Sequence, residues 1–234
     1  MKKTVLVICI ALASVAIVNA QGLKWGVRAG FNTSTISNFP EFEISSEGGN
    51  LSTSSPYKPG FQLGVVAQYM LTSQFGLESG LYYSQIGSRH EVKTSLADLY
   101  ATVITKTNPS YLQLPITVLY KFNVGTDLYL YPQAGLYLGY GLAGKVKFSY
   151  ETNIPDVGSE DVLGDDSLDL DFFGKDSETN RFDAGLTLGL NLQYSNYVIG
   201  VGYDLGLLKI NKESETGVKD MKNANVKVTL GYFF

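Results

Sequence analysis

The chain has 234 residues, of which 18 are basic and 22 are acidic, giving a formal net charge of −4 at pH 7. This acidic balance argues against nucleic acid as a partner. Tyrosine is abundant and proline is scarce (16 and 7 residues), a composition that suits long β-strands better than helices. The length is sufficient for one sizeable domain.

The first twenty residues have the features of a secretory signal peptide. Two lysines at positions 2 and 3 precede an apolar run over residues 4–18, and the small residues Val18 and Ala20 form a cleavage site. The run is shorter than the roughly 20 apolar residues that span a bilayer as a helix. We therefore expect residues 1–20 to be removed and residues 21–234 to form one domain.

Cys9, the single cysteine, lies in the predicted signal peptide and lacks the small preceding residue of a lipoprotein cleavage site. We therefore expect a mature chain with no disulfide and no lipid anchor. Without residues 1–20 the chain has 16 basic and 22 acidic residues, which gives a formal net charge of −6. The sequence implies no cofactor.

Apolar residues recur at every second position in eight stretches of about ten residues or more. This alternation is typical of strands that face lipid on one side. The stretches cover residues 23–33, 60–71, 75–87, 109–122, 128–143, 181–194, 197–208 and 225–234. Only a closed sheet leaves every backbone polar group paired in lipid. The sequence therefore predicts an all-β fold, an eight-stranded antiparallel up-and-down transmembrane β-barrel.

The connections between these stretches alternate between short and long. The short connections cover residues 72–74, 123–127 and 195–196, and the long polar ones cover residues 34–59, 88–108, 144–180 and 209–223. Outer-membrane barrels have short periplasmic turns and longer outer loops, so the pattern places both termini in the periplasm. The four outer loops are predicted to be mobile and to present a recognition surface.

Aromatic residues gather near both ends of the predicted strands. Those near the short connections are Trp25, Phe75, Tyr120, Phe122, Tyr194, Tyr197 and Phe234, and those nearer the long ones are Phe31, Tyr83, Tyr140 and Tyr203. Two such belts are typical of a barrel that crosses both membrane interfaces. We therefore expect the cell outer membrane as the location and its lipid as a partner.

Charged residues occupy the face opposite the apolar one. They are Arg28, Glu78, Lys121, Arg181, Asp183, Asp204 and Lys227. Buried charges need partners, and an eight-stranded barrel is about wide enough for side chains to fill it. The pattern favours a filled interior, while inward glycines such as Gly135 and Gly185 leave a narrow passive channel as the alternative.

The third long connection is strongly acidic from Glu151 to Glu178, where Lys175 is the single basic residue. Its cluster from Asp165 to Asp171 offers the carboxylate oxygens that Ca²⁺ prefers, but without the full spacing of an EF-hand loop. Clustered like charges favour a solvated, mobile loop. No metal ligand is assigned.

His90, the single histidine, begins the second long connection, with Ser84, Ser88 and Ser95 nearby in the sequence. A Ser–His pair would suit a barrel enzyme acting on lipid, although catalytic geometry is set in space. The sequence has no Gly-x-Ser-x-Gly motif, no His-Glu-x-x-His motif and no phosphate-binding glycine loop. No catalytic residue is assigned, and we expect no enzyme.

Four segments resemble the PorT-like family of outer-membrane β-barrels. They are residues 26–32, 111–115, 135–140 and 203–207. The resemblance covers the mature chain, but these motifs are structural, and Gln113 stands where such sequences often have glutamate. The founding member of the family is tied to a protein secretion pathway, so the resemblance suggests an accessory role in secretion that no residue here carries by itself.

The last stretch ends in Phe234, with apolar residues at every second position back to Val226. This end resembles the C-terminal signal by which the barrel assembly machinery recognises outer-membrane proteins. We therefore expect that machinery to be a partner during insertion.

The sequence thus predicts a small outer-membrane barrel with a structural or surface-interaction role, whose outer loops bind a protein or another surface ligand. The narrow channel and the lipid-modifying enzyme are the alternatives. A soluble lipocalin-like carrier would need an apolar interior, whereas charges and glutamines lie opposite the apolar face.

Overall fold

The computed structural model describes residues 22–37, 43–46, 49–96, 99–153, 170–173, 179–211 and 220–234. The predicted signal peptide and most of the acidic connection lie outside these ranges. Within them, no helix is both long enough and apolar enough to cross a membrane.

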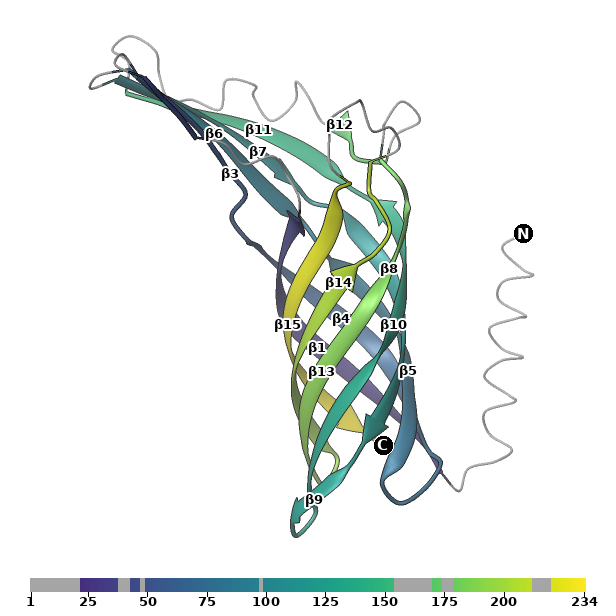
Figure 1. Cartoon of the computed structure of the whole chain (residues 1–234). Coiled ribbons are helices and arrows are strands. Elements are labelled where there is room, and N and C mark those ends of the chain that lie inside the picture. Colours follow the sequence, from purple (N-terminus) through teal and green to yellow (C-terminus); the bar gives the residue numbers. More distant parts are fainter. Residues whose placement is uncertain are drawn as a thin grey trace, which may run out of the picture.

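Eight long antiparallel strands in the described ranges close into a barrel (Figure 1). They are β1 (Leu23–Ser37), β4 (Lys58–Met70), β5 (Phe75–Gln85), β8 (Ser110–Tyr120), β10 (Leu128–Ala143), β13 (Phe182–Tyr194), β14 (Tyr197–Gly206) and β15 (Lys222–Phe233). Each strand pairs with the next along the chain, and β1 pairs with β15 to close the ring, with Gly26 opposite Phe233. The predicted eight-stranded up-and-down barrel is confirmed.

The strand bounds follow the predicted ones closely. Strand β10 covers residues 128–143 as predicted, and the largest difference is in β1, which continues to Ser37. Strand β8 is interrupted at Lys121 and continues as β9 (Phe122–Gly125), which also pairs with β10. The turns after β9 and β13 contain Asp127 and Ser195, whose φ angles of 54° and 52° suit tight hairpin turns.

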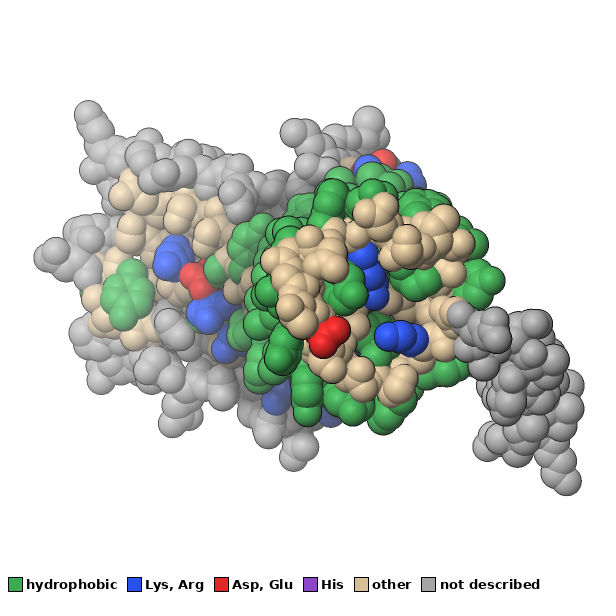
Figure 2. Space-filling model, turned by 90° about the horizontal axis from the view of Figure 1, so that it is seen from below, with side chains coloured by type: hydrophobic (Ala, Val, Ile, Leu, Met, Phe, Trp, Pro, Cys, Tyr) green, Lys and Arg blue, Asp and Glu red, His purple; other side chains and the backbone are tan. Residues whose placement is uncertain are grey.

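The outer surface of the barrel is apolar. Figure 2 shows a ring of hydrophobic side chains around the barrel. Leu63, Leu136 and Leu188 are among the exposed leucines of the barrel strands. Aromatic pairs lie at both ends of this surface. Tyr120–Phe122 and Tyr197–Tyr232 lie near the short turns, and Phe61–Tyr83 and Tyr140–Phe182 lie near the opposite end. The two predicted aromatic belts are thereby confirmed, and they mark the two membrane interfaces.

A second sheet, here called the outer sheet, continues from the barrel at the end opposite the short turns (Figure 1). In spatial order it consists of β12 (Leu170–Asp171), β11 (Lys145–Thr152), β7 (Leu99–Thr107), β6 (Ser88–Leu96), β3 (Gly49–Ser54) and β2 (Glu43–Ser46). The ladder that pairs Gln85 with Ser110 continues in the same register to Ser88 and Thr107. Strands β5 to β8 therefore form one long hairpin that leaves the membrane.

The prediction that residues 34–59, 88–108 and 144–180 are loops is wrong where the outer sheet forms, because the chain pairs there as strands. These strands do not face lipid, so they need no continuous apolar side. In β6, for example, Arg89, Glu91 and Lys93 alternate with His90 and Val92. A search for apolar alternation does not find such strands, because threonine, serine and charged residues occupy most of their positions.

Candidate functional site in the barrel and the outer sheet

A charged group lies in the middle of the barrel, built from four strands. Arg28 forms a bidentate ion pair with Glu78, with Nη1–Oε1 and Nη2–Oε2 distances of 2.8 and 3.2 Å. Gln68 donates to Glu78 Oε2 at 3.0 Å, and Arg28 also donates to the hydroxyl of Tyr131 at 3.4 Å. Both charged side chains are buried, so each charge depends on the other.

A second group is centred on the carboxylate of Asp204. Lys227 Nζ lies 2.6 Å from Asp204 Oδ1, which also accepts a hydrogen bond from Thr187 at 2.6 Å. Asn225 donates to Asp204 Oδ2 at 3.3 Å. The buried Asp204 thus has one cation and two neutral donors.

Two further predicted inward charges also find partners. Asp183 accepts hydrogen bonds at Oδ2 from Tyr137 at 3.1 Å and from Asn223 at 2.8 Å. Lys121 donates to Gln193 Oε1 at 2.8 Å, and its Nζ lies 5.3 Å from the centre of the Tyr131 ring.

The prediction of inward, partnered charges is confirmed for six of the seven residues. The exception is Arg181, which lies at the outer rim. It donates to the carbonyl oxygens of Gly141 and Phe173 at 3.1 and 2.6 Å.

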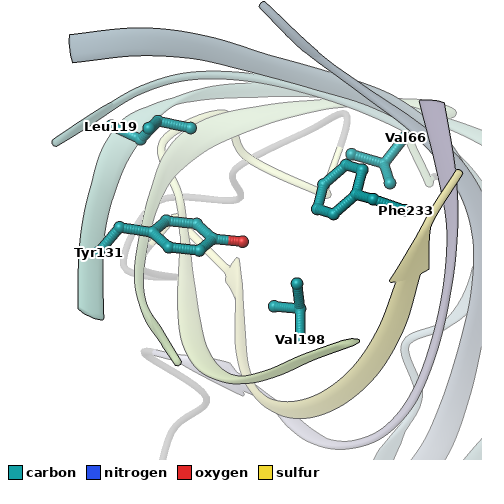
Figure 3. Close-up of a cluster of buried hydrophobic side chains, with 5 residues drawn as sticks. All are labelled: Val66, Leu119, Tyr131, Val198 and Phe233. Carbon is teal, nitrogen blue, oxygen red and sulfur yellow. The ribbon is translucent and has the colours of Figure 1, made fainter. Parts of the chain in front are cut away.

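An apolar cluster, here called the floor, fills the barrel at the end with the short turns. Figure 3 shows its members projecting into the interior from different strands. They are Val66, Leu119, Tyr131, Val198 and Phe233, each at most 2% exposed. The floor was not predicted from the sequence. Its signal there is a pair of adjacent apolar residues, as at Val65 and Val66, where one faces lipid and the other faces inward.

A second apolar cluster, here called the lid, lies at the outer end of the barrel. It consists of Ile86, Tyr111 and Phe173, with Phe172 packed against it. The ring of Phe173 approaches Gly141 so closely that a Cβ there would collide with it. Phe173 lies in the chain segment after β12, and no pattern in the sequence indicates that this segment folds into the barrel.

Between the floor and the lid lies a polar cavity of about 40 Å³, lined by Gln62, Gln133 and Asn191 among others. Ligand sites in proteins have volumes of about 300–1,000 Å³, so this cavity is too small for a substrate. It is also too small for a continuous column of water through the membrane. The geometry therefore describes a filled barrel.

His90 lies in β6 and is buried in the outer sheet. Its Nδ1 is 2.9 Å from the hydroxyl of Ser55, which was not among the serines predicted to lie near it. Ser88 instead bonds to the hydroxyl of Thr107 at 2.7 Å. Burial lowers the pKa of His90, which favours the neutral ring. Among the described residues, no cluster of three or more His, Cys, Asp or Glu side chains could hold a metal ion.

The outer sheet has a polar groove of about 560 Å³ on one face. Arg89, Lys93 and Tyr100 line it together with small polar residues. Glu91 lies between the two cations, with Arg89 Nε at 2.7 Å and Lys93 Nζ at 3.3 Å. The groove was not predicted from the sequence, because this region was predicted to be a loop.

The closed sheet, the apolar exterior and the paired interior charges define a transmembrane β-barrel of the bacterial outer membrane. Residues 19–212 match the family model described as outer membrane protein beta-barrel domain, and the chain belongs to this family. A search of curated proteins found no match.

Three solved structures illustrate what the chain is similar to. Ail of Yersinia pestis, solved with the heparin analogue sucrose octasulfate, shares 16% identity at a TM-score of 0.39, over 92% of this chain and 100% of that one. Neisserial surface protein A shares 16% identity at a TM-score of 0.43, over 92% and 100%. OprG of Pseudomonas aeruginosa shares 15% identity at a TM-score of 0.41, over 91% and 96%.

The Arg28–Glu78 pair gives a stability prediction. Arg28→Leu leaves the Glu78 carboxylate buried without its cation, so the free energy of unfolding should fall by about 3–5 kcal/mol. Urea unfolding of the refolded barrel in detergent micelles measures this, followed by the fluorescence of Trp25, the single tryptophan.

The matched control is the double variant Arg28→Leu/Glu78→Leu, which removes both charges. It should recover a large part of the lost stability, because no unpaired charge remains. The pair would not be coupled if the double variant lost as much free energy of unfolding as Arg28→Leu and Glu78→Leu lose when their separate losses are added.

Proposed function

We propose that this protein is a closed outer-membrane anchor that displays the outer sheet at the cell surface as an interaction surface. The observation that carries the proposal is the contrast between the two parts of the molecule. The barrel interior holds the apolar floor, the paired charges and only a small polar cavity, whereas the outer sheet continues the barrel hairpins beyond the outer aromatic belt.

The upper face of the outer sheet, which carries His90 and Val92, supports a role in contacting a protein or another surface ligand. Val92 and Val103 are directly opposite each other on β6 and β7, and they are 38% and 44% exposed. Thr94 and Thr105 lie on the same face, since they alternate with residues of the other face. Apolar contact area among neutral polar groups resembles the core of a non-obligate protein interface.

Two alternatives keep a specific observation in their favour. The polar cavity above the floor would belong to the path of a narrow passive channel. The PorT-like segments are residues 26–32 in β1 and 111–115 in β8, and they would favour an accessory role in protein secretion. Both alternatives keep the same barrel fold. The first differs in the function of the barrel interior, and the second in the partner of the outer sheet.

Surface display predicts a defined pattern of chemical labelling. The mature chain is expected to lack cysteine, so single cysteines can be placed at Ser95 in the outer sheet and at the exposed Val124 near a short turn. A membrane-impermeant maleimide on intact cells should label Ser95→Cys. It should label Val124→Cys only after the cells are lysed. Labelling of Val124→Cys in intact cells would place the outer sheet in the periplasm and overturn the proposal.

We also propose that Phe234 is recognised by the barrel assembly machinery. Its side chain is 75% exposed on the outer side of the barrel, which leaves it accessible to another protein. Phe234→Ser should slow folding into vesicles that contain the machinery by several-fold, while unassisted folding into detergent stays unchanged. Val124→Ser, an exposed apolar residue outside β15, is the control. An equal slowing of assisted and unassisted folding would contradict this role.

A further inference from the structure

The polar cavity inside the barrel is bordered by two ion pairs. Arg28, Glu78, Asp204 and Lys227 all line it, and residues of all eight barrel strands contribute to its wall. Its volume of about 40 Å³ is the space open to the centre of a water molecule. Each water needs about 10–15 Å³ of such space, so the cavity has room for about three water molecules.

Two buried polar atoms of residues that line this cavity have no hydrogen-bond partner among the described residues. They are Nε of Arg28, which is a donor, and Oε1 of Gln133, which is an acceptor. The other two nitrogens of the Arg28 guanidinium are bound to Glu78, so the Nε–H group is left over. Leaving a buried donor or acceptor unpaired is costly. The two atoms therefore need a molecule that accepts from one and donates to the other.

The cavity also meets an interruption in the barrel wall. The ladder between β5 and β8 pairs residues 79 and 116 and residues 82 and 113, but it omits residues 80 and 81. In this register Gly80 lies opposite Pro115, which has no backbone N–H to donate. Ser79 and Pro115 both line the cavity. The carbonyl group of Gly80 is thus a further acceptor at the wall of the cavity.

The charges around the cavity decide what kind of molecule fits there. A metal cation would lie beside Arg28 and Lys227, and it could not accept a hydrogen bond from Nε. An anion would lie beside Glu78 and Asp204, and it could not donate to Gln133. Water carries no net charge, and it both accepts and donates. A buried water typically makes about three hydrogen bonds to polar groups that are otherwise unpaired.

We propose that this cavity is a binding site for a cluster of about three water molecules. One water accepts a hydrogen bond from Nε of Arg28, and the cluster donates to Oε1 of Gln133 and to the carbonyl oxygen of Gly80. The cluster hydrates both ion pairs, which lowers the cost of burying their charges in the membrane. The inference concerns the barrel interior and does not depend on what the outer sheet binds.

The test is nuclear magnetic resonance of the full mature protein, labelled with ¹⁵N and refolded in detergent micelles. The signal of the Arg28 Nε–H group is assigned by its loss in Arg28→Lys. Cross-relaxation with water in the rotating frame is measured at this signal, because its sign separates a nearby water molecule from proton exchange with the solvent. The expected result is a direct contact between water and Nε–H in the natural protein.

Thr229→Leu fills the cavity from β15. Thr229 lines the cavity and lies on the same face as Gly231, where a Cβ would lie 3.4 Å from Nε of Arg28. The larger side chain should displace water, so the water contact of Arg28 should fall several-fold. The matched control is Thr33→Leu. Thr33 alternates with the buried Asn32 and Ser34 and so faces outward, and this variant should leave the contact unchanged.

A further variant tests the interrupted wall. Pro115→Ala restores a backbone N–H opposite Gly80, and this N–H should take the place of water at the Gly80 carbonyl. A crystal structure of the variant should therefore contain fewer ordered waters beside Gly80 than a crystal structure of the natural protein, while the water at Arg28 stays. This comparison tests the proposal even if Thr229→Leu fails to fold.

Three results would overturn the proposal. The first is the absence of a direct water contact at Nε–H of Arg28 in the natural protein. The second is an unchanged contact in Thr229→Leu, which would place that water outside the cavity. The third is a bromide ion inside the cavity of a crystal soaked in bromide, which would assign the site to an anion. None of these results changes the labelling pattern of Ser95→Cys and Val124→Cys, so a failure here is distinct from a failure of the proposed function.

Discussion

The pairing of backbone N–H and C=O groups around a closed ring of eight strands is the constraint on which the rest of this structure depends. In hydrocarbon an unpaired backbone group is too costly to leave exposed, so the sheet must close, and β15 returns to β1. A ring of eight strands has a narrow interior. Every charge inside it must therefore meet a partner from another strand, as Arg28 meets Glu78 and Lys227 meets Asp204.

The same pairing also builds the part of the molecule outside the membrane. The ladders of the barrel hairpins do not stop at the interface, and β6 and β7 remain in register with β5 and β8. The outer sheet is therefore held by the barrel through continuous backbone hydrogen bonds. Above the membrane the side that faced lipid is released from that requirement, and basic and small polar residues take the place of leucine and valine there.

The barrel was predictable from the sequence because each lipid-facing strand repeats a strong signal, apolar residues at every second position. The inward charges followed from the same alternation. The floor was harder to find, since Val66 and Val198 are apolar on a face that is otherwise polar. The lid was not predictable, because Phe173 reaches the barrel mouth through a long connection, and only the fold brings it to Tyr111.

The outer sheet was not predictable for a related reason. Its strands carry few apolar residues, and the pairing that defines them comes from neighbours far away in the sequence, such as Thr105 opposite Phe148. The predicted ends of the third and fifth apolar stretches, at residues 87 and 143, lie within two residues of the ends of β5 and β10. The sequence did not reveal that the chain continues there as strands, nor that Ser55 would meet His90.

Single-channel conductance of the purified protein in a planar bilayer is the most direct test of the central claim that this barrel is closed. The floor and the lid should prevent steady conductance in the natural protein. Because Phe173→Ala leaves the floor unchanged, this variant should remain silent as well. Steady conductance by the natural protein would contradict the account and favour a channel whose interior opens in the membrane.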